Sequence, residues 1–266
     1  MTGRLISALD RGFLFGDGVF DTMIVVDGRM VAGDAHVDRL CRHAAGIGMS
    51  IDRSRIENGL AVALSGLGSE PAILRTTVSR GVTARGLWPS AVPAPTIKIS
   101  VSAFDPSLIG RATALVTSEI PRNHRSPTAR IKSLNYLDNI LATRDAQAAG
   151  ADEALLLNTD GHVACSTMAN LFALVGTTLM TPPPGDGAMD GIVRASLLAD
   201  PPDGLTAIER SLTPDDVRNA DTVFLTNSVR LSRPVRRLDD RTWSSHPLET
   251  VILNHLQARL LQRPLA

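Results

Sequence analysis

Short runs of alternating apolar and polar residues recur along this chain, separated by segments with helical spacing. Between residues 11 and 33, two β-rich runs flank Asp27-Gly28, a pair typical of a tight hairpin turn. The same alternation predicts strands at residues 72–79, 96–103, 112–118, 154–157, 169–175, 178–181, 206–211 and 222–226. Helical spacing predicts helices at 35–46, 54–64, 134–149 and 246–261, with further helix starts near 191 and 214. Prominent hairpins in this mixture favour an α+β fold over a doubly wound parallel sheet.

Two local details sharpen the prediction. Asp34 is expected to be the N-cap of the helix at 35–46, whose apolar stripe is Val37, Leu40, Cys41 and Ala44. Arg39 lies off that stripe, so from spacing alone it is expected on the solvated surface. Around Asp160-Gly161, the runs 154–157 and 169–175 are expected to pair as a hairpin.

A polar, proline-bearing stretch at residues 119–126 interrupts the chain near its middle. Such composition is typical of a connector between domains. We therefore expect a small N-terminal α/β domain at 1–118, a connector at 119–126 and a larger C-terminal domain at 127–266. A chain of 266 residues is long enough for both to have a core.

Composition and charge exclude several classes of protein. The formal net charge is zero, so nothing indicates binding to nucleic acid or to an anionic membrane surface. No apolar run approaches the length of a membrane span, and the charged N-terminus does not resemble a signal peptide. Two distant cysteines and six scattered histidines form neither a disulfide framework nor a metal motif. We expect a cytoplasmic protein without a metal.

Lysine is scarce: the chain has only Lys98 and Lys132 among its 27 basic residues. A GC-rich genome would explain this bias without any function. Lys98 alternates with apolar residues in the predicted strand 96–103, and we expect it to face solvent. Lys132 follows an apolar approach, Ala129 and Ile131, and stands just before the predicted helix at 134–149. Partial desolvation at such a junction lowers the pKa of an amine and suits it to Schiff-base chemistry.

Five motifs in a fixed order carry a resemblance that covers nearly the whole chain. They are Phe15-Gly-Asp-Gly-Val-Phe20, His36-Val-Asp-Arg39-Leu40, Lys132-Ser-Leu-Asn-Tyr-Leu, Gly191-Ile-Val-Arg194 and Thr226-Asn-Ser228. Together they resemble the fold-type-IV pyridoxal-phosphate enzymes, which include branched-chain and D-amino-acid aminotransferases and aminodeoxychorismate lyases. The resemblance implies a two-domain α+β enzyme, like D-amino-acid aminotransferase, with pyridoxal 5'-phosphate at the domain interface. It also implies a homodimer acting on a small amino substrate.

The resemblance assigns roles to residues of this chain. Lys132 is implied to hold the cofactor covalently and then to act as general base and acid. Arg39 occupies the position that binds the cofactor phosphate, for which a guanidinium fork is suited. Tyr136 is placed one helical turn after Lys132, where it would reach the cofactor or simply pack. Other implied cofactor contacts are the backbone amides of Ile192 and Val193 and the polar groups of Asn227 and Ser228.

One position departs from the family pattern. Family members usually have a glutamate where this chain has Cys165, and that glutamate pairs with the pyridine nitrogen of the cofactor. A neutral thiol does not supply the same countercharge. The cofactor is then a weaker electron sink, which an elimination tolerates better than a transamination does. The alternatives are that Ser166 or a water replaces the glutamate, or that the chain has lost efficient catalysis.

Three details favour the lyase branch of the family. Arg85 lies in a loop that resembles the lyase loop and would meet a substrate carboxylate, and Leu87 replaces the histidine usual in D-amino-acid aminotransferases. Phe20-Asp21-Thr22 resembles the lyase pattern, with Phe20 at the substrate and Thr22 assisting proton transfer. The chain also lacks the N-terminal extension of many branched-chain enzymes. The expected reaction eliminates pyruvate from 4-amino-4-deoxychorismate and gives 4-aminobenzoate, a folate precursor; the alternative is an aminotransferase using D- or branched-chain amino acids.

Overall fold

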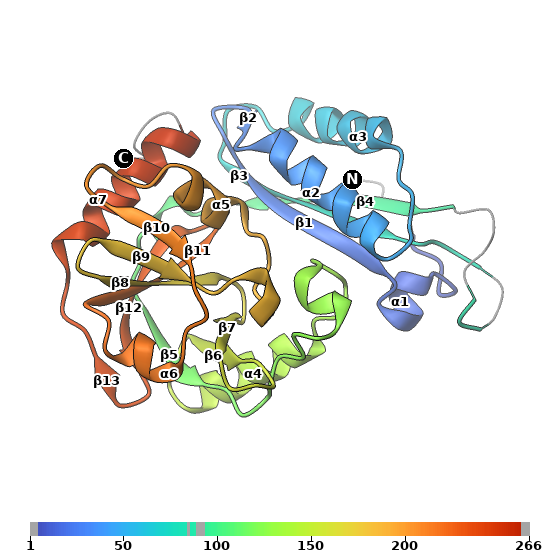
Figure 1. Cartoon of the computed structure of the whole chain (residues 1–266). Coiled ribbons are helices and arrows are strands. Elements are labelled where there is room, and N and C mark those ends of the chain that lie inside the picture. The colour runs from blue at the N-terminus through green and yellow to red at the C-terminus, as the bar shows by residue number, and fades with distance from the viewer. Residues whose placement is uncertain (1–4, 84–85, 89–93, 262–266) are drawn as a thin grey trace. The chain divides into compact units, whose positions relative to one another are not determined.

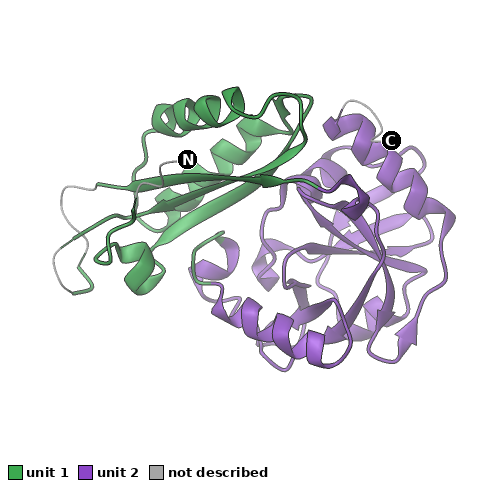
Figure 2. Cartoon of the chain, turned by 180° about the vertical axis from the view of Figure 1, so that it is seen from behind, with its two compact units in different colours: residues 1–104, 131–135 green, residues 105–130, 136–266 purple. Residues whose placement is uncertain are grey.

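The computed structural model describes residues 5–83, 86–88 and 94–261, which form two compact units (Figure 2). Unit 1 consists of residues 1–104 and 131–135, and unit 2 of residues 105–130 and 136–266. The division therefore differs from the expected boundaries at 118 and 127. Residues 105–118 belong to unit 2 because their strand pairs with two of its strands, and residues 131–135 return to unit 1, where Ser133 bridges Val19.

Unit 1 is built on a four-stranded antiparallel sheet in the order β2-β1-β3-β4. Its strands are β1 (Gly18–Val26), β2 (Arg29–Met30), β3 (Ala72–Ser79) and β4 (Thr96–Ala103). Its helices are α1 (Arg11–Phe15), α2 (Gly33–Gly46) and α3 (Arg53–Ser65). Figure 1 shows α2 and α3 lying on one face of this sheet. Alternate strand residues, among them Val19, Met23, Leu74 and Val78, form the core there with Leu40 and Ile56 of the helices.

The predicted hairpin at Asp27-Gly28 is confirmed, since both residues have positive φ, 52° and 70°, and join β1 to β2. The N-cap prediction for the next helix is wrong. α2 begins one residue before Asp34, its N-cap is Ala32 with φ 52°, and no side chain caps it. Asp34 instead lies in the first turn, where its charge still suits the positive end of the helix dipole.

Unit 2 contains a mixed sheet in the order β10-β9-β8-β11-β12-β5-β6-β7, with β13 paired to β12. Its strands are β5 (Thr113–Thr117), β6 (Glu153–Leu157), β7 (Val163–Ser166), β8 (Asn170–Val175), β9 (Thr178–Thr181), β10 (Thr206–Glu209), β11 (Thr222–Asn227), β12 (Leu231–Leu238) and β13 (Arg241–Thr242). The partner of β6 at Asp160-Gly161 is β7, not the strand at 169–175 as expected. That strand, β8, pairs with β9 and β11, and the sequence reading missed β7 and β12.

The helices of unit 2 pack on this sheet, with α4 against β6, α5 against β11 and α7 against β12. They are α4 (Leu137–Ala148), α5 (Ile192–Ala199), α6 (Pro214–Arg218) and α7 (Pro247–Leu256), with short turns at η1 (Pro106–Leu108), η2 (Pro127–Arg130), η3 (Pro184–Asp186) and a π-helical η4 (Gln257–Leu261). α6 starts where predicted: Thr213 is its N-cap, and the Thr213 side chain forms a capping box with Asp216. The mixed sheets and helices confirm the α+β prediction. Among the described residues, no helix is both long and apolar enough to cross a bilayer.

Candidate active site

Lys132 lies in an extended segment of unit 1, and two backbone hydrogen bonds fix its position. Its carbonyl oxygen accepts a hydrogen bond from the Phe20 amide at 2.9 Å. Its own amide donates to Nδ1 of His43, a buried residue of α2, at 3.1 Å. The lysine is half-buried, so its side chain is held at the edge of β1 rather than in bulk solvent.

The lysine amine lies over an aromatic ring. Nζ of Lys132 is 4.5 Å from the centroid of the Phe20 ring, a distance typical of a cation–π contact. Phe20 and Thr22 alternate on β1 and therefore face the same side of the sheet. The structure thus places the Lys132 amine on the Phe20 ring, and Thr22 lies on the same side of β1 as Phe20.

The opposite side of β1 carries a buried charged network. Asp21 has no exposed surface, and its two carboxylate oxygens accept hydrogen bonds from Nε and Nη2 of Arg39, both at 2.8 Å. His36, also on α2, donates from Nδ1 to the same carboxylate at 2.8 Å. Arg39 is only 3% exposed, so the expectation of a solvated surface arginine is wrong. Helical spacing did not predict the burial of Arg39, because the spacing within α2 contains no information about its partner Asp21, which is on β1.

Burial and pairing set the charges of this network. Burial by itself would raise the pKa of Asp21, but the hydrogen bonds from His36 and Arg39 and the charge of Arg39 hold that pKa well below its ordinary value. Burial lowers the pKa of His36, against the opposing effect of Asp21, so this histidine is neutral at pH 7. Asp21 and Arg39 therefore form a buried ion pair that fixes the guanidinium. A phosphate bound by Arg39 would share that group with Asp21.

In unit 2, the start of α5 has the features of an anion site. Its N-cap is Gly191, and no side chain caps the helix, so the amides of Ile192 and Val193 point out of its first turn. A Cβ at Gly191 would come within 2.0 Å of Oδ1 of Asn170, so any larger residue would have to displace the Asn170 side chain. Asn170 is the register partner of Thr226, whose buried hydroxyl has no hydrogen-bond partner. These groups fit the phosphate of pyridoxal 5'-phosphate.

The end of β11 and the turn that follows it contain the Thr226-Asn227-Ser228 motif. Oδ1 of Asn227 accepts hydrogen bonds from the amides of Val229 and Arg230, so this side chain shapes the turn after the strand. Ser228 is half-buried in the same turn. Thr226, which the sequence reading passed over, is the residue of this motif with an unsatisfied buried donor. An unpaired hydroxyl at the end of a strand is the signal that could have identified it.

The helical argument for Tyr136 is wrong. Lys132 is not in a helix, because Ser133 forms a bridge with Val19 of β1, and α4 begins only at Leu137. Tyr136 is the N-cap residue of α4 and is half-buried. A one-turn relation between the two side chains therefore does not exist. Its contact with a cofactor stays a prediction.

Cys165 is buried in unit 2 among small apolar side chains. It lies opposite Leu156 in the β6–β7 ladder and packs in a cluster with Ala142 and Ala146 of α4. Burial raises the pKa of its thiol, and nearby Glu153 acts in the same direction, although Arg122 opposes it. The thiol is therefore neutral at pH 7, as the sequence analysis assumed.

A second buried carboxylate, which the sequence did not single out, lies beside this cysteine's strand. Glu153 has no exposed surface and accepts hydrogen bonds from Arg233 at 2.6 Å and from the hydroxyl of Ser166 at 2.7 Å. Arg230 lies 3.4 Å from the same carboxylate. The Ser166 hydroxyl thus already donates its hydrogen bond to Glu153. This argues against Ser166 taking the place of the family glutamate that Cys165 replaces. Burial lowers the pKa of Arg233.

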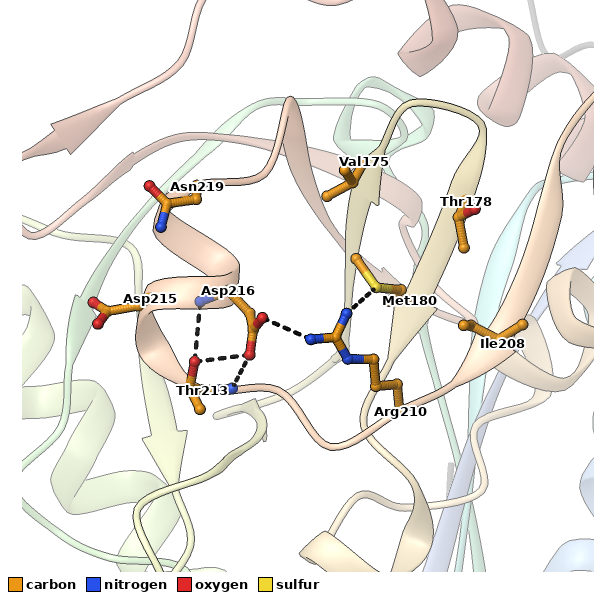
Figure 3. Close-up of a pocket in the computed structure, with 9 residues that line it drawn as sticks. All are labelled: Val175, Thr178, Met180, Ile208, Arg210, Thr213, Asp215, Asp216 and Asn219. Atoms are coloured by element: carbon orange, nitrogen blue, oxygen red, sulfur yellow. Dashed lines mark hydrogen bonds and ion pairs between the residues drawn. The ribbon is translucent and has the colours of Figure 1, made fainter.

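A hollow of about 550 Å³ lies elsewhere in unit 2, between the β8–β10 strands and α6 (Figure 3). Arg210 in its wall donates to Asp216 at 2.9 Å and lies against the sulfur of Met180. Asp216 also completes the capping box of α6, so these polar groups already serve the fold. None of the residues singled out for the reaction lines this hollow. Arg85, the expected carboxylate ligand, lies outside the described residues.

Comparisons with known proteins agree with this arrangement. The family model described as "Amino-transferase class IV" matches residues 18–238. A putative branched-chain-amino-acid aminotransferase of Methanocaldococcus jannaschii is 33% identical over 89% of this chain and 83% of its own length. A D-alanine aminotransferase of Bacillus licheniformis is 30% identical over 95% of this chain and 90% of its own length.

Solved structures extend the comparison to the fold. A putative 4-amino-4-deoxychorismate lyase of Legionella pneumophila is 31% identical, with a TM-score of 0.86 over 98% of this chain and 96% of that one. A hypothetical aminotransferase from Mycobacterium tuberculosis, solved in a PLP-bound form, is 26% identical. Its TM-score is also 0.86, over 98% of this chain and 95% of that one.

Proposed function

Because this chain belongs to the class IV aminotransferase family, we propose that it binds pyridoxal 5'-phosphate covalently through Lys132. The amine lies at the edge of β1 against Phe20, and its backbone is fixed on both sides. In unit 2, the uncapped start of α5 and the unpaired hydroxyl of Thr226 suit a phosphate dianion. The bound cofactor supplies a sink for negative charge at the carbon next to the substrate amine.

The reaction we propose is the elimination of pyruvate from 4-amino-4-deoxychorismate to give 4-aminobenzoate. The observation that carries this choice is the neutral, buried thiol of Cys165. A neutral partner leaves the cofactor a weaker electron sink, and elimination followed by aromatisation of the ring depends on that sink less than transamination does. The similarity to the Legionella pneumophila protein that is titled a putative 4-amino-4-deoxychorismate lyase, at 31% identity, supports the same choice.

The residues around the lysine suit the proton transfers of this elimination. The Lys132 amine takes the proton from the carbon that bears the substrate amine. The ether bond to the enolpyruvyl group then breaks, and the departing oxygen needs a proton. Thr22, on the same side of β1 as Phe20, is the hydroxyl that we assign to this step. Phe20 covers one side of the amine and limits its access to water.

Covalent attachment is tested by spectroscopy and mass spectrometry. The purified protein should show a visible absorbance band that borohydride abolishes, and the reduced adduct should map to the peptide containing Lys132. Lys132→Ala should lose both the band and the adduct. Lys98→Ala is the matched control, because it removes the chain's other lysine, and it should keep both. An adduct on Lys98, or none in the wild type, would contradict the proposal.

The reaction itself is tested by a substrate panel. Incubation with 4-amino-4-deoxychorismate should release pyruvate and 4-aminobenzoate in equal amounts. The second candidate function is that of an aminotransferase, favoured by the names of the Methanocaldococcus and Bacillus relatives. Turnover of D-alanine or a branched-chain amino acid with 2-oxoglutarate, faster than pyruvate release, would establish that alternative. A protein that holds the cofactor but turns over neither substrate would be a catalytically impaired homologue.

The proposal includes assembly as a homodimer, with apolar residues around α1 in the interface. Phe13 is 75% exposed and Leu87 is 76% exposed. Arg11 donates hydrogen bonds to the carbonyls of Gly86 and Leu87, which places both apolar side chains near α1. Exposed apolar groups gathered in this way are typical of a protein interface. Sedimentation equilibrium should give twice the chain mass, and Phe13→Ser should shift the protein toward monomer.

A further inference from the structure

The last turns of α2 hold the segment that carries Lys132. His43 and Gly46 are three residues apart, so they lie on the same side of this helix. Nδ1 of His43 accepts a hydrogen bond from the Lys132 amide at 3.1 Å. A Cβ at Gly46 would come within 3.0 Å of Cδ1 of Ile131, so the helix surface at this glycine receives the Ile131 side chain. Two neighbouring residues of the lysine segment therefore contact one side of α2.

The chain is bent at Lys132, and the bend leaves its amide to be bound by α2. The Ser133 amide donates to the Ile131 carbonyl at 2.8 Å, which makes Lys132 the central residue of a three-residue turn. The Lys132 carbonyl accepts from the Phe20 amide on β1 at 2.9 Å. The Lys132 amide takes no part in that turn, and it donates to the buried ring of His43 instead. A backbone N–H that faces a buried side chain needs an acceptor there.

This hydrogen bond fixes which nitrogen of the His43 ring carries the proton. A backbone amide can only donate, so Nδ1 of His43 is the unprotonated nitrogen. A neutral imidazole has one donor and one acceptor, and the proton is therefore on Nε2. His36, about two helical turns earlier on α2, has the opposite arrangement, because its Nδ1 donates to Asp21 of β1. One histidine of α2 thus binds the strand as a donor, and the other binds the lysine segment as an acceptor.

We propose that His43 is a positioning residue for the reacting amine, and that its contribution is the acceptor at Nδ1. The Lys132 amide bonds to α2, which lies on one face of the unit 1 sheet (Figure 1). The Lys132 amine lies on Phe20, on the side of β1 opposite to Asp21. The anchor and the reactive group therefore belong to one residue at the edge of the sheet, and fixing the backbone restricts where the amine can move. This inference rests on the proposed function, because it takes Lys132 as the reacting amine.

Three substitutions at position 43 separate the acceptor from the bulk of the ring. His43→Leu fills a similar space and has no acceptor. His43→Asn puts a carbonyl oxygen on Cγ, the atom that carries Nδ1 in histidine, whereas His43→Gln puts it one bond farther from the backbone. The Lys132 amide should therefore regain an acceptor in the Asn variant, and this variant should behave like the wild type.

Hydrogen exchange of the full chain, with and without the cofactor, measures the anchor directly. The Lys132 amide should exchange about tenfold faster in His43→Leu and His43→Gln than in the wild type, and within about threefold of it in His43→Asn. Nitrogen NMR of the wild type should show Nδ1 of His43 unprotonated. Ile56→Val on α3 is the control, because it removes a methyl group from the same core and no polar group. It should lower the urea midpoint and leave exchange at Lys132 unchanged.

Covalent capture measures the effect on the amine. When pyridoxal 5'-phosphate and borohydride are added to the cofactor-free chain, modification of Lys132 should be about tenfold slower in His43→Leu and should recover in His43→Asn. Lys98 is exposed on β4, as the sequence predicted, and its modification is the internal reference that should not change. Turnover of 4-amino-4-deoxychorismate should follow the same order, with kcat lowered and KM within about threefold of the wild type.

Equal exchange of the Lys132 amide in the wild type and His43→Leu would overturn the inference. Faster exchange with unchanged capture would overturn it as well, because the hydrogen bond would then not position the amine. If His43→Asn were as slow in capture as His43→Leu, the ring and not its acceptor would be responsible, and the inference would again be wrong.

Failure of the proposed function gives a different result. If borohydride attaches no cofactor to Lys132 in the wild type, the proposed function is wrong, and the exchange series still reports whether His43 holds the Lys132 amide. If the cofactor attaches equally fast in the wild type and His43→Leu, the function stands and only the role of His43 fails.

Discussion

The two faces of β1 carry different chemistry, although the residues that make them are neighbours in one strand. Asp21 points toward α2, has no exposed surface and pairs with Arg39 and His36. Phe20 and Thr22 point the other way, where the amine of Lys132 lies over the Phe20 ring. One face therefore uses charge to hold a helix on the sheet, and the other carries the groups that we propose act on the substrate.

Substitutions of adjacent residues in this one motif should therefore change different properties of the protein. A buried ion pair contributes through the two charges together, and removal of one partner leaves the other charged and without water. A hydroxyl on a partly exposed face has no such cost. Changes at Asp21 should therefore appear in the free energy of unfolding, and changes at Thr22 in turnover.

The largest effect is expected for Asp21→Asn. Loss of the carboxylate leaves Arg39 charged and buried, so the free energy of unfolding should fall by about 3–5 kcal/mol. Urea titration followed by circular dichroism measures it. Asp34→Asn is the matched control. The Asp34 side chain is 99% exposed and lies on α2, the helix that carries Arg39, so its substitution should change the free energy of unfolding by less than about 0.5 kcal/mol. Equal urea midpoints for wild type and Asp21→Asn would show that the buried ion pair does not stabilise the fold.

The pH dependence of stability sharpens the same point. The pKa of Asp21 is lowered in the folded protein, so its stabilising contribution is fully present above the ordinary aspartate pKa of about 3.9. As pH falls below that value toward the folded pKa, the contribution is lost at up to about 1.4 kcal/mol per pH unit. The deficit of Asp21→Asn relative to wild type should therefore shrink between pH 5 and pH 2 in urea titrations. Asp17 and Glu249, whose pKa values are also lowered, remain in both proteins and cancel. A constant deficit would show that the charge of Asp21 is not the cause.

Thr22→Val tests the other face. It keeps the shape of the side chain and removes the hydroxyl, so kcat for pyruvate release should fall about tenfold, or about 1.4 kcal/mol in the barrier. The visible band and the urea midpoint should stay as in the wild type. Ser100→Ala removes another hydroxyl from the same side of the unit 1 sheet and should leave kcat unchanged. If Thr22→Val lowered stability and left turnover intact, the two faces would not be divided as we describe.

The strands of unit 1 could be predicted because their pattern is local. Residues 72–79 and 96–103 alternate clearly, and β3 and β4 have those bounds. β12 was missed because Pro234 and three arginines interrupt its sequence, although most of it is buried between β11 and β5. Its strand character depends on partners far away in the chain, which no local window contains.

The site shows the same limit. The motifs predicted roles for Lys132, Phe20 and Thr22, but they did not predict the pairing of Asp21 with Arg39, which joins a strand to a helix 18 residues later. A signal was present: Asp21 alternates with Val19 and Met23 in an otherwise apolar face of the strand. A carboxylate in such a position requires a buried cationic partner. The sequence therefore indicated that Asp21 needs a buried cationic partner, but it did not indicate which of the 25 arginines is that partner.

The smallest effect is expected for Cys165→Ala, which separates burial from charge. Cys165 is buried as Asp21 is, although 7% of its surface is exposed, and its thiol is neutral and packs among alanines in unit 2. Its removal leaves only a sulfur-sized space, so the free energy of unfolding should fall by about 1 kcal/mol. Turnover should stay within about threefold, since a neutral thiol supplies no countercharge for alanine to remove. Cys41→Ala, at a half-buried thiol in α2, is the control.

If Cys165→Ala lowered the free energy of unfolding as much as Asp21→Asn does, burial alone would explain both losses. The charge of the Asp21–Arg39 pair would then not be their cause. A tenfold loss of turnover would instead mean that the thiol acts in the reaction.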